Sequence, residues 1–334
     1  MTIVSCLASS YLWIKKYSNN IFVITFLLLG FLIPPFVHSA TWSQILVNFF
    51  GFSYRSISTL KVAGWVQFSC YSSLGTGIML LALSKINKKE IVAAKIYRED
   101  KYIFSKIIIP SIKPVIIIIF GIVFILSFSD YTVPSLFAQS VYSQEIMGEF
   151  NSSYDQTRAL FLAIPLLVVQ ISVFVIILIQ LKQDLYQKSE SYDYDFKIKL
   201  PKIYDALLFI SLLMVLSSII LPIGILILSK DTISSLPGAL EAADKELLSS
   251  LKINLLAALG IMIFILPLSL SVLATKNSKT FLILFVLPLI LPSSLIGISL
   301  INAFFRVLPK SLYNSSLMPI IAVWQKSLPF VLPS

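Results

Sequence analysis

Side chains that could do chemistry are few in this sequence and lie far apart. Cys6 and Cys70 are too few and too differently placed to predict a disulfide framework or a metal site. His38 is the single histidine, has no cysteine or acidic residue near it in the sequence, and is expected at the membrane interface. Asp130 follows a long apolar run, so its carboxylate either gates a polar pathway or caps the membrane end beside Tyr131. We predict no catalytic residue, no metal and no cofactor.

The most basic stretch lies at residues 86–113, between two apolar runs. Eight basic residues lie in this stretch or directly before it: Lys85, Lys88, Lys89, Lys95, Arg98, Lys101, Lys106 and Lys113. Loops this rich in lysine and arginine stay on the cytoplasmic side, which also places the N-terminus in the cytoplasm. Small and apolar residues recur at helical spacing and predict a short helix from Glu90 to Asp100. Pro110 cannot occupy a helix interior without removing a backbone hydrogen bond, so it predicts a turn or kink.

The composition predicts a polytopic membrane protein, because 57% of the 334 residues are hydrophobic and only 13% are charged. A helix needs roughly 20 mostly apolar residues to cross a bilayer. Eight segments qualify: 21–39, 62–84, 111–129, 159–181, 205–229, 251–274, 280–304 and 316–334. The predicted fold is therefore all-α, a transmembrane helical bundle of about eight spans. The net charge of +10 reflects topology and attraction to anionic lipid rather than nucleic-acid binding.

Two polar features interrupt this apolar pattern. Small and hydroxyl residues occur throughout the span 62–84 and allow close helix packing. We therefore expect this span to face other helices, and a second candidate for its polar face is the solute pathway. The stretch before Arg158 contains Glu145, Glu149 and Asp155. It is expected to be a solvated loop, or else an acidic face that meets a binding protein.

The order of motifs in and after the basic stretch resembles a known family. Ala93-Ala94, then charged and aromatic residues, then Ile109-Pro110 and the sequence FILSFSDYTVPSLF at 124–137 are similar to the EAA loop and following helix of binding-protein-dependent ABC importer permeases. Among these, the chain looks most like the two-repeat permeases of the ferric-iron, thiamine and phosphonate group. In that family the loop docks on the cytoplasmic ATPase. The resemblance thus implies a coupling role for Glu90, Ala93, Ala94, Arg98, Ile109 and Pro110, although Val92 replaces the motif's leading Glu and Arg98 its Gly.

The resemblance also implies an organisation into two repeats with the type I importer fold. The first repeat is expected at 1–182 with its loop at 86–113, a cytoplasmic linker at 183–203, and the second repeat at 204–334. Pro35 matches Pro292 and Ser73 matches Pro329 at almost the same offset, which indicates an internal repeat. We expect a chain incomplete at both ends relative to a family member of roughly twelve helices, either a gene fragment or part of a split permease.

The function that the resemblance implies is that of a multi-pass permease subunit in a bacterial inner (plasma) membrane. It would move a small solute, ferric iron or a small organic compound, delivered by a periplasmic or lipid-anchored binding protein. Its expected partners are an ABC ATPase at the basic loop, that binding protein, membrane lipid, and a second permease chain or another copy. ATP hydrolysis would belong to the ATPase, because the sequence has no Gly-Lys-Ser/Thr phosphate loop.

Three alternatives remain open. An ion-coupled secondary transporter needs ionisable residues or broken helices within the membrane, and only Asp130 and Lys326 come near. A membrane enzyme needs clustered His, Asp or Glu at one membrane face, which a single histidine does not favour. A non-functional permease fragment agrees with the same motifs.

Overall fold

The computed structural model describes residues 1–15, 17, 20–86, 88–153, 156–182, 202–228, 230–274, 291–292, 295–301 and 317–327. The predicted all-α fold is confirmed for these residues, which contain helices joined by turns and short extended segments. The chain divides into two compact units. The first contains Met1–Ser140 and Val173–Ser229, and the second contains Val141–Ser172 and Lys230–Ser334.

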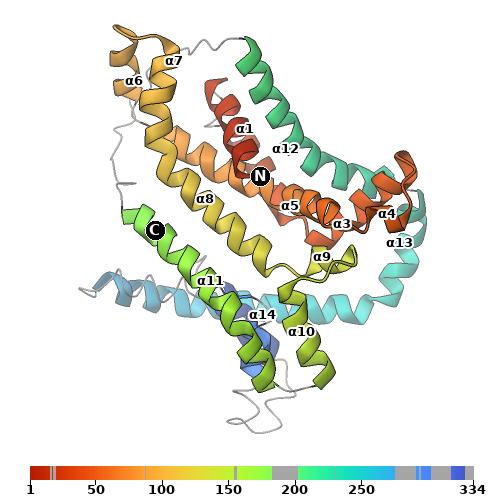
Figure 1. Ribbon diagram of the computed structural model, residues 1–334. Coiled ribbons are helices and arrows are strands. Elements are labelled where there is room, and N and C mark those ends of the chain that lie inside the picture. The colour runs from red at the N-terminus through yellow and green to blue at the C-terminus, as the bar shows by residue number, and fades with distance from the viewer. Residues whose placement is uncertain are drawn as a thin grey trace. The chain divides into compact units, whose positions relative to one another are not determined.

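The first unit contains most of the described helices, which Figure 1 labels along the chain. In chain order they are α1 (Thr2–Ile14), α2 (Ile21–Leu32), α3 (Pro35–Gln44), the π-helix η1 (Ile45–Phe49), α4 (Tyr54–Ile57), α5 (Leu60–Ser84), α6 (Lys88–Lys95), α7 (Asp100–Ile103), the π-helix η2 (Phe104–Ile108), α8 (Ile109–Ser129), α9 (Thr132–Leu136) and α12 (Lys202–Leu228). The second unit contains α10 (Tyr142–Ser153), α13 (Lys230–Ala242), α14 (Asp244–Ala274) and α18 (Leu317–Ser327). The residues of α11 (Gln156–Lys182) are shared between the two units.

α5 is the central helix of the first unit and packs against α1, α2, α3, α8, α9 and α12. The most apolar 18-residue stretch of α5 is 67% buried, whereas the corresponding stretches are 39% buried in the span that ends with α8 and 33% buried in α12. α5 is also the least apolar of the candidate spans. Small and hydroxyl side chains bring neighbouring helices close to α5, whereas the more apolar spans leave side chains exposed. The expectation that this span faces other helices agrees with the structure.

Five helices among the described residues are long and apolar enough to cross a membrane: Leu60–Ser84, Asp100–Ser129, Thr157–Gln180, Lys202–Leu228 and Asp244–Ile263. The segments Ile21–Leu32 and Pro35–Phe49 make a sixth if they form one span, which is bent by 85°. The predicted count of eight is not confirmed. The candidate 280–304 lies largely outside the described residues, and α18 covers only 11 residues of the candidate 316–334.

The N-terminal helix α1 belongs to the core although none of the expected spans covered it. It packs against α5 and α12 and buries Ala8, Leu12 and Trp13. At its C-terminal end Lys15 Nζ lies 3.3 Å from Asp205 Oδ1 of α12. Unit 1 therefore includes one helix from before the first expected span and one from after the predicted linker.

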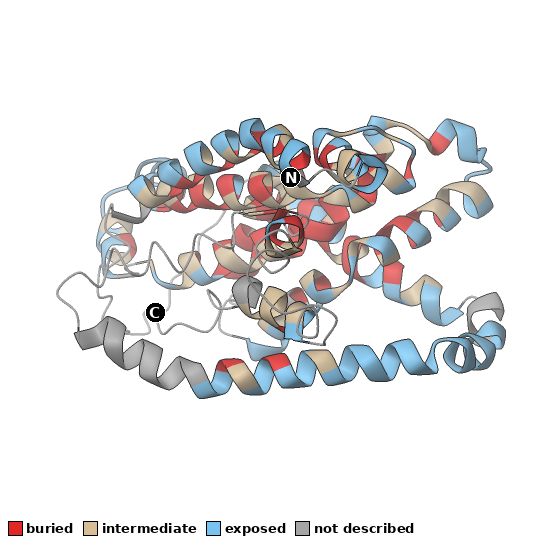
Figure 2. Cartoon of the chain, turned by 90° about the horizontal axis from the view of Figure 1, so that it is seen from below, coloured by how far each residue is buried: buried red, intermediate tan, exposed pale blue. Residues whose placement is uncertain are grey.

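α14 differs from these helices because its residues 244–263 are mostly exposed. Only 11% of the most apolar stretch within Asp244–Ile263 is buried, and exposed residues dominate the coloured part of this helix in Figure 2. Its described packing partner within the second unit is α18. Apolar side chains exposed along a long helix are expected where the helix faces lipid.

Candidate functional site

The basic loop after α5 folds into α6 and α7. Ile91 is fully buried in the core of the first unit, and Ala94 packs partly against the same core. Ala93 lies on the exposed side of α6. Ile96 and Tyr97, just beyond the helix, are 70% and 84% exposed. α6 is therefore anchored by one face and presents small and apolar side chains on the other.

The end of α6 corrects the predicted helix from Glu90 to Asp100, because α6 ends at Lys95. The amides of Tyr97 and Arg98 both donate to the carbonyl of Ala94, at 3.1 and 2.9 Å. Two donors on one carbonyl close the helix in a tight turn. The chain then changes direction before α7.

Two side-chain contacts brace this change of direction, and we call residues 88–102 the elbow. Lys95 Nζ lies 3.3 Å from Asp100 Oδ1. The guanidinium carbon of Arg98 lies 4.9 Å from the centre of the Tyr102 ring, a favourable cation–π arrangement. Glu90 is exposed in the first turn of α6, where a negative charge favours a helix N-terminus.

Pro110 does not produce the predicted turn or kink between separate segments. α7, η2 and α8 follow one another without a break and form a single candidate span from Asp100 to Ser129. Pro110 lies at the start of α8, directly after the π-helical turn Phe104–Ile108. The wider hydrogen-bond spacing of a π-turn accommodates a local irregularity inside a helix, so the helix continues through a residue that lacks an amide hydrogen. Ile109 beside it is 42% exposed.

Asp130 lies at the other end of α8 and holds the start of α9. Its Oδ1 accepts the amides of Thr132 and Val133, at 2.9 and 3.4 Å. Its Oδ2 accepts from Gln67 Nε2 at 3.3 Å, and Ser127 Oγ donates to Gln67 Oε1 at 2.7 Å. Burial raises the pKa of the Asp130 carboxyl above its ordinary value, although the hydrogen bonds from Gln67 and the backbone oppose that shift.

The predicted site residues therefore fall into three places. Glu90, Ala93, Ala94 and Arg98 share the elbow. Ile109 and Pro110 follow α7 and η2 in the same continuous helix. Asp130 ends the 21-residue helix α8 and so lies about 30 Å from Pro110 along the helix axis, at about 1.5 Å per residue.

A buried polar cluster in the first unit, which includes His38, was not predicted from the sequence. The imidazole of His38 was expected at the membrane interface, but His38 is fully buried. His38 Nδ1 lies 2.9 Å from Ser69 Oγ, and Trp42 Nε1 donates to the same oxygen at 3.0 Å. α3 packs against α5 and thereby gives the imidazole a polar partner inside the core. The recurrence of hydroxyl side chains along α5 was the available signal.

The same cluster joins α1 and α12 to α5. Ser5 Oγ of α1 donates to the carbonyl of Ser72 at 3.0 Å. The hydroxyls of Ser72 and Ser218 lie 3.0 Å apart, and Ser69 Oγ donates to the carbonyl of Ser218 at 3.2 Å. Hydrogen bonds between membrane helices stabilise particular helix pairings. Four helices thus meet through polar contacts that no spacing within one helix could reveal.

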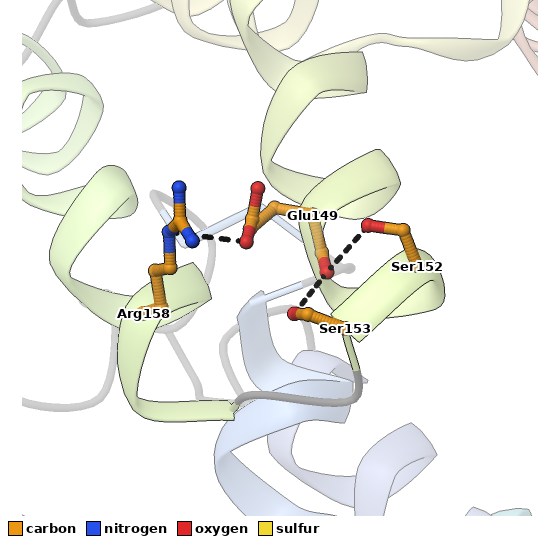
Figure 3. A network of polar contacts seen from close by, with 4 residues as sticks. All are labelled: Glu149, Ser152, Ser153 and Arg158. Atoms are coloured by element: carbon orange, nitrogen blue, oxygen red, sulfur yellow. Dashed lines mark hydrogen bonds and ion pairs between the residues drawn. The ribbon is translucent and has the colours of Figure 1, made fainter.

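Glu145 and Glu149 of the acidic stretch before Arg158 lie in a helix, α10, rather than in the expected loop. Asp155 lies outside the described residues. Arg158 Nε of α11 lies 3.1 Å from Glu149 Oε1, and Ser152 and Ser153 donate to the carbonyl of Glu149 at 3.2 and 2.7 Å (Figure 3). Serine hydroxyls thus donate hydrogen bonds to a backbone carbonyl near the C-terminal end of α10. The acidic side chain at this position is paired with the local base.

Comparison with known families identifies the chain. Residues 4–183 match the family described as binding-protein-dependent transport system inner membrane component, which is more than half of the chain. The chain belongs to this family. As a family member it is a permease component of an ABC importer, a multi-pass inner-membrane protein that moves solute rather than catalysing a reaction. The family resemblance is thus confirmed at this level.

Comparison with curated proteins and with solved structures gave no match. The family implies association of this permease with an ATPase and a binding protein. The matched region contains α5, the elbow and α8.

Proposed function

We propose that this permease carries a small solute, ferric iron or a small organic compound, delivered by an extracytoplasmic binding protein, and that a separate ATPase docks on its elbow. The observation that carries the docking proposal is the orientation of α6. Ile91 fixes one face of this helix in the core, whereas Ala93, Ile96 and Tyr97 on the other side are exposed. Large exposed apolar side chains beside a small one suit contact with a protein surface.

The proposal also includes the orientation in the membrane, the EAA-type loop, the permease subtype and the first repeat. The basic residues around the elbow support a cytoplasmic position for it and for the N-terminus. The EAA-type assignment of residues 86–113 and the subtype among ferric-iron, thiamine and phosphonate permeases follow from the sequence motifs. The family match ends at residue 183, which supports a first repeat over 1–182. The predicted linker 183–203 lies almost entirely outside the described residues.

Co-purification with the candidate ATPase in detergent tests the docking proposal. Ala93→Glu places a charged, larger side chain on the exposed side of α6, and we expect it to abolish co-purification. Ala239→Glu makes the same change at an exposed helical alanine of α13 and should retain the ATPase. Equal retention in both variants, or no binding by the unaltered chain, would refute docking at the elbow.

Transport into proteoliposomes separates the importer from its rivals. We expect uptake that requires both ATP and the ATPase. Uptake driven by an ion gradient without the ATPase would instead indicate a secondary transporter, and neither kind of uptake would indicate a non-functional fragment.

A further inference from the structure

Near the break between α2 and α3 lie two buried polar atoms, His38 Nε2 of α3 and Ser73 Oγ of α5, to which the described residues give no hydrogen-bond partner. The two helices are bent by 85° at Ile33 and Pro34. Gly30, near the end of α2, lies so close to Ser73 of α5 and Ile219 of α12 that an added Cβ would collide with Ile219. His38 in α3 contacts Ser69, one turn before Ser73 on α5. The break thus borders a polar part of the core.

Pro222 decides where the protons lie in this cluster. In an α-helix the carbonyl of Ser218 would accept the amide of residue 222, but Pro222 lies inside α12 and has no amide hydrogen. Ser69 Oγ, at 3.2 Å from this carbonyl, supplies the missing donor. The single hydroxyl hydrogen of Ser69 is therefore committed to Ser218.

The tautomer of His38 follows from that commitment. Trp42 Nε1 can only donate, so it occupies one lone pair of Ser69 Oγ at 3.0 Å. His38 Nδ1, at 2.9 Å, must then donate its own hydrogen to the second lone pair. A neutral imidazole that carries its hydrogen on Nδ1 leaves Nε2 with a bare lone pair.

His38 Nε2 and Ser73 Oγ have no hydrogen-bond partner among the described residues. His38 Nε2 belongs to a residue with 0% exposure, and Ser73 Oγ to one with 1% exposure. Serine in a helix can satisfy itself by donating to the carbonyl four residues back, as Thr76 does to Ser72 at 2.8 Å, but Ser73 Oγ makes no such bond. A buried polar group without a partner is costly and points to a bound molecule.

We propose that the α2–α3 break binds a small uncharged molecule whose O–H or N–H donates to His38 Nε2, with Ser73 Oγ as the second contact. The donor is a water molecule or, if the proposed function holds, a hydroxyl or amide of the transported solute. The protein atoms bonded in this cluster are hydroxyl, indole, imidazole and carbonyl groups, which recognise uncharged hydrogen-bonding groups. No group of three or more metal-ligating side chains occurs among the described residues, which disfavours a metal ion on Nε2. A metal ion is therefore the competing occupant that the test must exclude.

Nitrogen-15 NMR of the permease in liposomes tests this directly, because His38 is the single histidine. With ring-labelled histidine, we expect a protonated Nδ1 and an unprotonated Nε2 that accepts a hydrogen bond. Transfer of magnetisation from water to Nε2 identifies water as the donor. A hydrogen-bonded Nε2 without that transfer, lost after prolonged washing in detergent, identifies a small solute.

Three results would overturn the proposal: a protonated Nε2, an Nε2 signal typical of a free lone pair, or a signal that changes when a metal chelator is added. Ser73→Ala should alter the Nε2 signal and leave Nδ1 unchanged, whereas Ser69→Ala should alter Nδ1. Ser84→Ala is the matched control, since the Ser84 hydroxyl donates to the Leu81 carbonyl within its own helix end, and it should alter neither signal. This readout does not depend on ATPase binding, so failure of the proposed function and failure of this inference are distinguishable.

Discussion

Asp130 joins the end of one helix to the start of the next with a single carboxylate. One oxygen accepts two backbone amides of the α9 turn, and the other faces Gln67 of α5. Asparagine retains an acceptor for those amides, whereas alanine removes it. We therefore expect Asp130→Ala to lower the free energy of unfolding by about 1 kcal/mol and Asp130→Asn to lower it much less.

Thermal unfolding in detergent measures this difference, and transport by the same variants separates the two roles of Asp130. A cap needs the acceptor, so Asp130→Asn should transport normally. A gate needs the charge, and a folded Asp130→Asn variant without transport would show that the carboxylate gates the pathway.

The pH dependence of stability provides an independent check on Asp130. Because burial raises the pKa of this carboxyl, the folded state binds its proton more readily than the unfolded state. The resulting stability is present at low pH and is lost as the pH rises through the folded-state pKa. We expect the melting temperature of the wild type, relative to Asp130→Asn, to rise as the pH falls from neutral towards the ordinary pKa of an aspartate, about 4. A constant difference over this interval would contradict the shift.

His38 shows what a sequence cannot reveal about a residue. Its neighbours in the sequence, a proline pair and a tryptophan, are typical of a membrane interface. Its partner Ser69 lies 31 residues away on another helix, so burial and hydrogen bonding depend on how α3 packs against α5. By contrast, a short helix at Ile91 and Ala94 was predicted from helical spacing within one segment. The burial of Ile91 and the exposure of Ile96 and Tyr97, which that spacing placed on one face, depend again on packing.

Within α12, the bond from Ser69 to the Ser218 carbonyl replaces one that Pro222 removes. Pro222→Ala restores an amide donor to that carbonyl and should make the Ser69 hydroxyl partly redundant. We expect Ser69→Ala to destabilise the Pro222→Ala background by about 1 kcal/mol less than it destabilises the wild type. The double-mutant cycle from the four unfolding curves isolates this coupling, since losses at Trp42 and His38 occur in both backgrounds. Strict additivity would refute it.

The pairing of α14 with α18 depends on Gly260. The indole of Trp324 lies where a Cβ on Gly260 would stand, and its Nε1 donates to the carbonyl of Ala257 at 2.7 Å. We expect Gly260→Leu to displace the indole and expose α18 to limited proteolysis.

Gly224→Leu, in the helix α12, is the matched control for Gly260→Leu. A Cβ at Gly224 of α12 meets no atom within 4 Å, so this variant should digest like the wild type. Equal digestion of Gly260→Leu and the wild type would contradict the close contact. Tryptophan fluorescence gives a second readout, since a displaced indole changes its surroundings.

At the scale of elements, sequence patterns located the helices better than their ends. The apolar runs of α5, α8, α11 and α12 were predicted because each covers about a bilayer thickness. The end of α6 at Lys95 and the π-turn before Pro110 depend on carbonyls shared between local amides, which hydrophobic periodicity does not encode. α1 was missed because its 13 residues are too short for a span and include several serines.

At the scale of the first unit, the prediction to test is that α5 crosses the membrane, with the basic loop on the cytoplasmic side. α5 separates Phe52 from Tyr97, and both side chains are exposed. In a variant whose native Cys6 and Cys70 are replaced by serine, we expect Tyr97→Cys to react with an impermeant thiol reagent only from the cytoplasmic side. Phe52→Cys should react only from the outer side. The reverse pattern would invert the orientation expected from the basic loop, and labelling of both cysteines from one side would contradict α5 as a span.

At the scale of the chain, composition predicted a helical membrane protein and the motifs predicted its family, because both depend on segments that the sequence displays directly. The membership of the compact units did not follow from the sequence. α12 comes after the predicted linker, but Ser218 and Ile219 place it against α5 and α2 of the first unit. Repeat boundaries follow sequence similarity, whereas packing follows the polar and small residues that distant helices present to each other.

The position of Ser218 has a consequence for how the protein is made. The Ser69 hydroxyl bonds a carbonyl 149 residues further along the chain. During synthesis at about 5–20 residues per second, α5 enters the membrane several seconds before α12 exists. Hydroxyls that are buried in the finished protein must meanwhile face the insertion machinery, lipid headgroups or a chaperone. Ribosomes stalled before residue 202 should therefore present a nascent chain that crosslinks to insertase subunits through α5, and release from the insertase should coincide with the emergence of α12.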